Sequence, residues 1–117
     1  MKNIKSIDPI GLEINELHKI LLSSIAPRPI AFASTVDSNG NVNLSPFSYF
    51  NVFSSNPPIL IFSPSRRVRD NTTKHTLENA IETKEVVINV VNFPIVEQMS
   101  KSSIEYEKGV NEFIETG

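Results

Sequence analysis

Two stretches of this sequence carry the residue types from which a small-molecule site could be built. The first runs from Asn43 to Pro58 and holds four aromatic side chains beside hydroxyl and amide residues. The aromatics are Phe47, Tyr49, Phe50 and Phe53, and the polar residues are Ser45, Ser48, Asn51, Ser54 and Ser55. Flat apolar rings beside free N–H, C=O and hydroxyl groups suit a planar ligand with a polar edge. The alternative is a packed loop whose aromatics plug one end of a barrel, because aromatic clusters more often form core than pocket.

The second stretch, from Ser65 to Thr76, is basic and rich in hydroxyl groups. Four of the chain's 11 Lys and Arg residues lie here, namely Arg66, Arg67, Arg69 and Lys74. The loop leads into the N-terminus of a predicted helix, so free backbone N–H groups, the helix dipole and arginine side chains together favour a phosphate dianion. The alternative is a solvated loop with an ordinary helix cap at Thr72 or Thr73.

Other catalytic and metal-binding patterns are absent from the sequence. The chain has no cysteine, which excludes disulfides, thiolate metal sites and cysteine nucleophiles. His18 and His75 each lack an acid or nucleophile partner at motif spacing, and there is no glycine-rich dinucleotide fingerprint or P-loop. If the protein is an enzyme, a bound cofactor must therefore supply the reactivity.

Length and composition indicate one ordinary globular domain, residues 1–117, with 39% hydrophobic and 21% charged residues. A net charge of −2 gives no reason to expect nucleic acid as a partner. No apolar run reaches membrane-spanning length, and the N-terminus has no apolar signal core. We therefore predict a cytoplasmic protein that does not bind membranes.

The hydrophobic pattern places the two stretches in a mainly β chain with short helices. Residues 30–36 and 41–44 are predicted to form a hairpin, because the Asn39-Gly40 pair between them supplies the positive-φ positions that hairpin turns prefer. Pro46 removes a backbone donor, so we expect the chain to leave the sheet there and continue as an irregular wall.

The remaining pattern predicts two buried strands and several short helices. The apolar runs 59–63 and 85–91 are typical of strands covered on both faces. Short helices are expected around residues 14–21, 76–83, 95–99 and 102–105. Residues 1–11 are expected to form a loosely docked arm. About four strands cannot close a barrel, so either the strands pair with a second subunit or the chain is incomplete. We expect a homodimer.

Several short motifs follow one another in a fixed order along the chain. They are residues 26–35 (APRPIAFAST), residues 43–51 (NLSPFSYFN), Pro57-Pro58, and Lys74-His75-Thr76 with Asn79. In order and spacing they resemble the FMN-binding split-barrel family of flavin reductase-like and flavoredoxin-like proteins, from about His18 to the C-terminus. The resemblance implies a Greek-key split β-barrel that forms a homodimer and holds FMN near the subunit interface.

The resemblance also implies which residues bind FMN. The isoalloxazine ring should contact residues of the aromatic stretch, namely Asn43, Ser45, Pro46, Phe47, Ser48, Tyr49 and Asn51. The ribityl phosphate should face Ser63, Arg67, Lys74 and Thr76. Arg28 and Thr35, in the family's opening strand, are further expected contacts. No protein side chain is assigned a catalytic role and no metal site is implied.

The chain departs from the family pattern in two respects. His75 stands where the family usually has an aspartate between the lysine and the threonine, which affects the helix cap and phosphate binding. Family members also continue well beyond the position that matches Gly117. The chain therefore resembles a C-terminally short member, with a natural short form, a truncated gene product and a fragment as the alternatives.

The implied function is an NAD(P)H-dependent flavin reductase or a related flavin electron carrier, with FMN as cofactor and NAD(P)H as co-substrate. One alternative is a non-catalytic, dimeric interaction domain that has lost flavin binding. A third reading, an oligonucleotide-binding small barrel, would stack bases on Phe47, Tyr49 and Phe50. The acidic balance of the chain disfavours this last reading.

Overall fold

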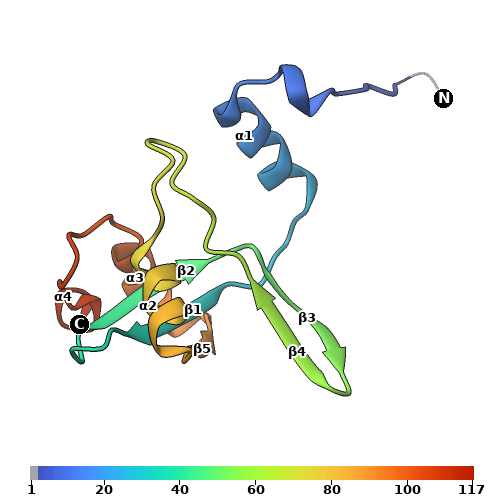
Figure 1. The fold of residues 1–117 in the computed structure, drawn as a ribbon. Helices are drawn as coiled ribbons and strands as arrows, with labels where there is room; N and C mark the ends of the chain where they lie inside the picture. Colours follow the sequence, from blue (N-terminus) through green and yellow to red (C-terminus); the bar gives the residue numbers. More distant parts are fainter. Residues whose placement is uncertain (1–2) are drawn as a thin grey trace.

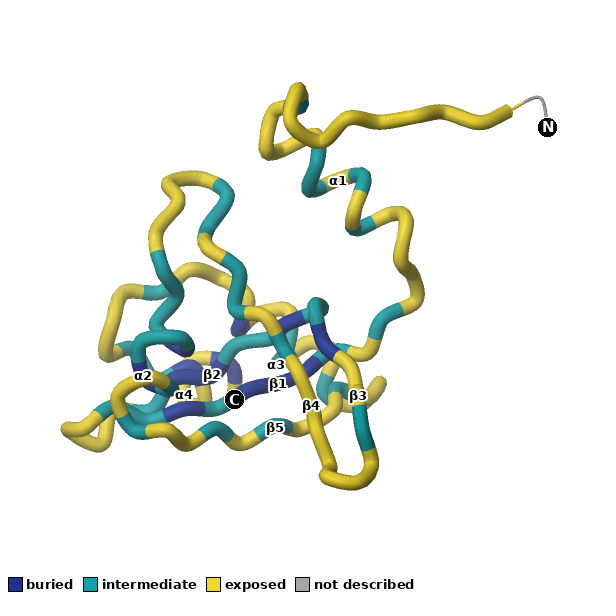
Figure 2. The backbone as a smooth tube through the Cα atoms, turned by 45° about the vertical axis from the view of Figure 1, so that its right-hand side comes forward, coloured by how far each residue is buried: buried dark blue, intermediate teal, exposed yellow. Residues whose placement is uncertain are grey.

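Residues 3–117, the part that the computed structural model describes, form two antiparallel sheets and several short helices (Figure 1). The sheets have the strand orders β2-β1-β5 and β3-β4. The predicted mainly β class with short helices is confirmed. The radius of gyration is 16.3 Å, whereas a compact domain of this length has about 13 Å. The difference arises because α1 and the β3–β4 hairpin project from the body of the molecule (Figures 1 and 2).

The first hairpin agrees with the sequence prediction. β1, Ala31–Val36, pairs antiparallel with β2, Val42–Phe47. The carboxylate of Asp37 accepts the backbone N–H groups of Asn39 and Asn41, each at 2.9 Å, and Gly40 has the positive φ of 84° that the Asn-Gly pair predicted. Hydrogen bonds from the side chain and then the backbone of Asn41 lower the pKa of Asp37.

The predicted departure of the chain from the sheet at Pro46 is wrong, because β2 continues to Phe47 with Pro46 opposite Phe32. β2 is an edge strand. The N–H of Leu44 points away from β1, since it donates to the carboxylate of Glu112 at 3.1 Å. Pro46 lies two residues further along and faces the same way, so its missing donor costs no bond to β1.

The predicted irregular wall is also wrong, because most of it forms a second hairpin. β3, Phe50–Ser55, pairs with β4, Pro58–Phe62, with an irregularity between Val52 and Ser54. The predicted cover on both faces of the run 59–63 is not found, since Ile59, Leu60 and Ile61 are 41%, 51% and 50% exposed. Figure 2 shows the hairpin extending away from the other sheet, with most of β4 coloured as exposed.

The second predicted buried strand is present but is likewise uncovered. β5, Val87–Val90, pairs with β1, and Val87 and Val90 are 61% and 60% exposed. The core is small and surrounds the central strand β1. It consists of Ala31, Ala33, Phe47 and Phe50, with Phe62, Val86 and Ile88 packed against it.

The helices agree with the sequence in part. The predicted helices appear as α1, Ile14–Ser24, α2, His75–Thr83, and the pair η2, Phe93–Ile95, and α3, Val96–Ser102. The predicted helix at residues 102–105 is wrong, because α3 ends there and residues 103–106 are irregular. Two short elements, η1, Pro9–Gly11, and α4, Glu112–Thr116, were not predicted.

The helices differ in how they meet the sheets. α2 packs on β1 and β2, and α3 and α4 pack on β2. α1 stands apart, with none of its residues buried. In the expected N-terminal arm, residues 3–10 are exposed, while Met1 and Lys2 lie outside the described residues. None of the helices in residues 3–117 is long and apolar enough to cross a membrane.

Candidate functional site

Two neighbouring cavities lie where the loop of residues 63–74 passes the end of β2. The larger, about 870 Å³, is lined by α1, residues 46–49 and that loop. The smaller, about 170 Å³, is lined by β2, the start of α2, residues 102–106 and Glu112. Pro46, Arg67, Lys74 and Glu105 line both cavities. These shared residues make the two cavities one elongated recess, with an aromatic end and a polar end.

The structure brings most of the predicted site residues to this recess. Those at the larger cavity are Pro46, Phe47, Ser48, Tyr49, Ser63, Arg67 and Lys74. Those at the smaller cavity are Asn43, Ser45, Pro46, Arg67, Lys74 and Thr76. Arg28, Thr35 and Asn51 line neither cavity. Asn51 is exposed on β3, where its side-chain oxygen accepts the N–H of Val52 at 2.7 Å.

The aromatic end is formed by Phe47 and Tyr49 on one side and α1 on the other. The ring of Phe47 packs on Phe62, with centroids 5.3 Å apart. The hydroxyl of Tyr49 lies 3.1 Å from Nδ1 of His18, which links α1 to the body. The guanidinium carbon of Arg28 lies 5.5 Å from the centroid of the Tyr49 ring. Arg28 thus supports the wall of the cavity from outside.

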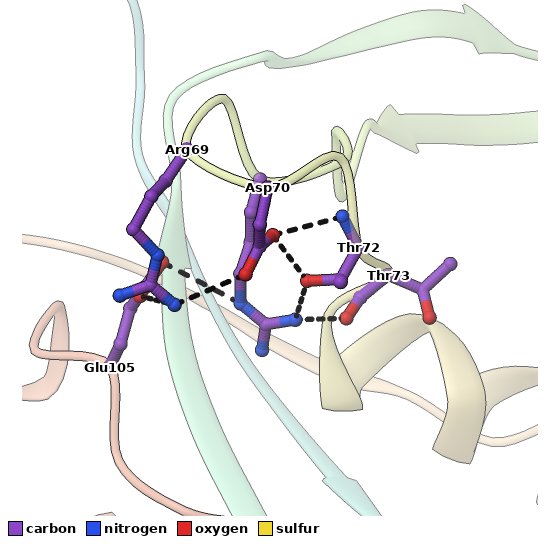
Figure 3. A network of polar contacts seen from close by, with 6 residues as sticks. Arg69, Asp70, Thr72, Thr73 and Glu105 are labelled. Carbon is purple, nitrogen blue, oxygen red and sulfur yellow. Dashed lines mark hydrogen bonds and ion pairs between the residues drawn. The ribbon is translucent and has the colours of Figure 1, made fainter.

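At the polar end, Arg67 is bound within its own loop. Its Nη1 donates to the hydroxyl of Thr72 at 3.0 Å and to the carbonyl of Thr73. Figure 3 shows the neighbouring contacts of Asp70, which accepts the N–H and hydroxyl of Thr72. These bonds, led by the one from the Thr72 hydroxyl, lower the pKa of Asp70 to about 2. Arg67 and Asp70 therefore hold the shape of the loop.

Lys74 is the cation placed to meet a bound anion. Its ammonium lies 5.1 Å from the centroid of the Phe47 ring, at the junction of the two cavities. Within residues 3–117 it has no hydrogen-bond or ion-pair partner. Burial, and secondly the charge of Arg67, lower the pKa of Lys74. An anion in the recess would offset both effects, because a nearby opposite charge favours the charged ammonium form.

Lys74 is also the N-terminal boundary residue of α2. No side chain caps this helix, so the alternative of a cap at Thr72 or Thr73 is wrong. Thr73 instead donates its hydroxyl proton to Glu78 at 2.9 Å. The first N–H groups of a helix have no partner within it. With Lys74, His75 and Thr76 all lining the smaller cavity, these donors lie beside it.

Two buried polar pairs fix α2 to the first hairpin. The Asn43 amide donates to the hydroxyl of Thr76 at 2.8 Å, and the Asn79 amide donates to the hydroxyl of Thr35 at 3.1 Å. Thr76 is only 1% exposed, and its hydroxyl keeps a proton to donate. Thr35 therefore positions α2, and a direct contact of Thr35 or Arg28 with FMN stays a prediction.

Glu112 is a site residue that the sequence reasoning missed. It is 5% exposed, lines the smaller cavity and accepts the N–H of Leu44. Burial raises the pKa of its carboxyl group. The sequence analysis gave no role to Glu112, because α4 was not predicted. Asn111, whose side chain accepts the N–H of Phe113 at 3.0 Å, is the N-cap signal that would have located this helix.

Replacing Glu112 with glutamine is expected to increase the free energy of unfolding at neutral pH. The glutamine oxygen still accepts the Leu44 N–H, while the cost of burying a charge disappears. Because the folded-state pKa of Glu112 is raised, its contribution to stability is present at low pH and is lost as pH rises through that pKa. Glu112→Ala removes the acceptor and should cost about 1–3 kcal/mol.

Urea unfolding of the three proteins at mildly acidic and at neutral pH measures these effects. The glutamine variant should gain stability relative to wild type as pH rises. Equal destabilisation of the glutamine and alanine variants at neutral pH would mean that the Leu44 N–H needs a charged acceptor. The predicted increase in the free energy of unfolding for Glu112→Gln would then be wrong.

Comparisons with known proteins identify the family of this chain. The profile of the family described as "Flavin reductase like domain" matches residues 22–117. An uncharacterized protein of Aquifex aeolicus is 43% identical over 101 residues, which are 86% of this chain and 51% of that protein. The chain spans about half the length of the curated relatives it matches.

Solved structures show the same fold. Nitrilotriacetate monooxygenase component B from Bacillus cereus superposes with a TM-score of 0.90 at 30% identity, covering 99% of this chain and 56% of that one. A flavin reductase-type protein with a split barrel domain from Shewanella frigidimarina gives a TM-score of 0.70 at 31% identity, covering 91% and 50% of the two chains. The expected split-barrel fold is confirmed, although the sheets within residues 3–117 do not close into a barrel.

Proposed function

We propose that this chain, which belongs to the flavin reductase-like domain family, binds FMN in the recess formed by its two cavities. One observation carries the proposal. The aromatic end and the polar end of the recess are continuous at Pro46 and Lys74, so one FMN molecule, whose ring and phosphate are joined by the ribityl chain, could extend through both. A flavin-related function follows from the family, whereas FMN as the particular flavin is our proposal.

The ring would lie in the larger cavity against Phe47, Ser48 and Tyr49. The backbone and hydroxyl groups of this segment offer donors and acceptors to the polar edge of the ring. α1 closes the opposite side through apolar residues, namely Ile14, Leu17, Leu21 and Leu22. This cover limits the access of water to the ring.

The phosphate would lie in the smaller cavity. Lys74 supplies a positive charge that makes no ion pair or hydrogen bond in the described residues, and the start of α2 supplies backbone donors. The hydroxyl of Thr76, held by Asn43, can donate its proton to a phosphate oxygen. These groups fit a dianion better than a neutral hydroxymethyl group.

When bound, FMN would supply the electron-transfer chemistry, with NADH or NADPH as the proposed electron donor. The protein's own contribution would be positional. Phe47 and Tyr49 orient the ring, and Lys74 fixes the phosphate, so that one ring face is held in a constant position for a co-substrate. A homodimer, a cytoplasmic location and the absence of nucleic-acid or membrane partners stay predictions.

The purified protein should therefore be yellow, or become so when FMN is added. Transfer of the ring from water to an aromatic cavity changes its visible absorption and quenches its fluorescence. The measurement is a spectral titration with FMN, with bovine serum albumin as a non-specific control. Colourless protein with no FMN-dependent change at high micromolar concentrations would contradict the proposal.

That negative result would favour the second candidate, a non-catalytic dimeric interaction domain. The exposed apolar side chains of the β3–β4 hairpin are the observation that supports it. In that case a variant with Lys74 replaced should dimerise as readily as the wild-type protein, because the dimer interface would not include the recess.

A further inference from the structure

Glu105 places a negative charge at the point where an anionic ligand is expected. The residue lies in the irregular segment between α3 and α4 and lines both cavities together with Arg67 and Lys74. Its carboxylate oxygens lie 3.6 Å from Nε of Arg67 and 2.9 Å from Nη2 of Arg69. Figure 3 shows the Glu105 side chain reaching across to Arg69 from a separate segment of the chain. Glu105 thus pairs with the loop that should receive the phosphate.

The contacts of Glu105 are of the kind that a ligand can replace. Its side chain is 45% exposed, and an exposed ion pair contributes little to stability. Arg69 has a second partner, Asp70, at 3.2 Å, and Arg67 keeps its bonds to Thr72 and Thr73. Removal of Glu105 would therefore leave the loop folded and would make the Nε edge of Arg67 available to another anion.

The charge of Glu105 also acts on Lys74. Burial and Arg67 lower the pKa of Lys74, and the Glu105 carboxylate opposes this by raising it. An incoming anion would have to share Lys74 and Arg67 with this carboxylate or expel it. Because a dianion attracts the two cations more strongly than a single carboxylate does, a phosphate monoester can expel Glu105 where a monoanion cannot.

We propose that Glu105 is an internal competitor for the anion site, which is displaced from Arg67 and Arg69 when a phosphate monoester binds. Glu105 then limits which anions bind, because a singly charged anion cannot replace it at the two arginines while a dianion can, and a neutral ligand does not compete with it. The proposal rests on the proposed FMN function for the identity of the ligand. The competition between the Glu105 carboxylate and a phosphate group does not depend on that function and should also occur with inorganic phosphate.

The test compares wild type with Glu105→Gln, a change that removes the charge and keeps the shape. FMN should bind about fivefold more tightly to the variant, the effect expected for losing exposed ion pairs that compete with the ligand. Riboflavin, which lacks the phosphate, should bind equally to both proteins. Calorimetric titrations at constant ionic strength give these affinities.

A matched control is Glu107→Gln, because Glu107 is exposed in the same segment and its side chain has no ion pair within residues 3–117. The control makes the same change in net charge two positions away, and FMN should bind to it as to wild type. If the two variants gained FMN affinity equally, the gain would come from the change in overall charge, and the proposal would be wrong. Weaker FMN binding by Glu105→Gln would also overturn it, because Glu105 would then be holding Arg67 in place for the ligand.

Inorganic phosphate separates this proposal from the proposed function. Phosphate should raise the thermal unfolding midpoint of Glu105→Gln at lower concentrations than it does for wild type or Glu107→Gln. If no flavin bound to wild type and this shift were seen, the FMN function would fail and the competition would stand. If phosphate stabilised all three proteins equally, the competition would be refuted, whatever the flavin results.

Discussion

Lys74→Ala is expected to weaken FMN binding roughly tenfold or more while leaving riboflavin binding nearly unchanged, because a charge-assisted hydrogen bond is worth about 1.5–3 kcal/mol. FMN and riboflavin differ only in the terminal phosphate. Lys74 has no partner in residues 3–117, so its removal leaves no other group unpaired. The change also removes the contact of its ammonium with the Phe47 ring.

Parallel titrations with the two flavins measure this effect, and Lys101→Ala on α3 is a control with the same loss of charge. Arg67→Ala provides a contrast. Because Arg67 bonds to Thr72 and Thr73, its loss should disorder the loop and weaken both flavins. Equal weakening of both flavins by Lys74→Ala would show that Lys74 supports the fold and does not bind the phosphate.

Leu60→Asp is expected to convert a homodimer into monomers. Leu60 lies opposite Val52 in the β3–β4 hairpin, and the two side chains are 51% and 60% exposed. Covering such a patch with a second copy of the chain places Leu60 in the interface twice, once from each protomer. With about 1.5–3 kcal/mol for each buried leucine, and more for burying a charge, dissociation should become at least about a thousandfold more favourable.

Sedimentation equilibrium or light scattering over a range of concentrations measures the association state. Ser55→Asp is the matched control, because it adds the same charge at the exposed end of the hairpin, opposite Pro58. This variant should remain dimeric. If the wild-type protein stayed a folded monomer at every concentration, the predicted homodimer would be wrong.

Local signals in the sequence located the elements that carry the site. The turn at residues 37–40 depends on the positive φ of Gly40 and on the Asp37 carboxylate, both within one hairpin. The start of α2 at His75 lies one residue from the predicted start, because the pattern of its own residues indicates this helix. Motifs of this kind specify their structure within a few residues.

Long-range contacts account for what the sequence did not reveal. The apolar run 59–62 has the composition of a buried strand, but composition does not say which element covers it. Pro46 was expected to end β2 because the sequence does not show which side of a strand is open. The bond between Leu44 and Glu112 joins residues 68 positions apart, from a helix of only five residues. The periodic spacing of apolar residues does not predict a contact between residues so far apart in the sequence.

The two edges of the three-stranded sheet differ in their capacity to accept a further strand. On the outer side of β2, the N–H of Leu44 is bound to Glu112 and Pro46 has no N–H at all. The opposite edge, β5, pairs with β1 alone among residues 3–117. Two usable edges would let copies of the sheet add one after another into a fibre. A sheet with one usable edge can join only one other such sheet, so growth through it stops at a pair.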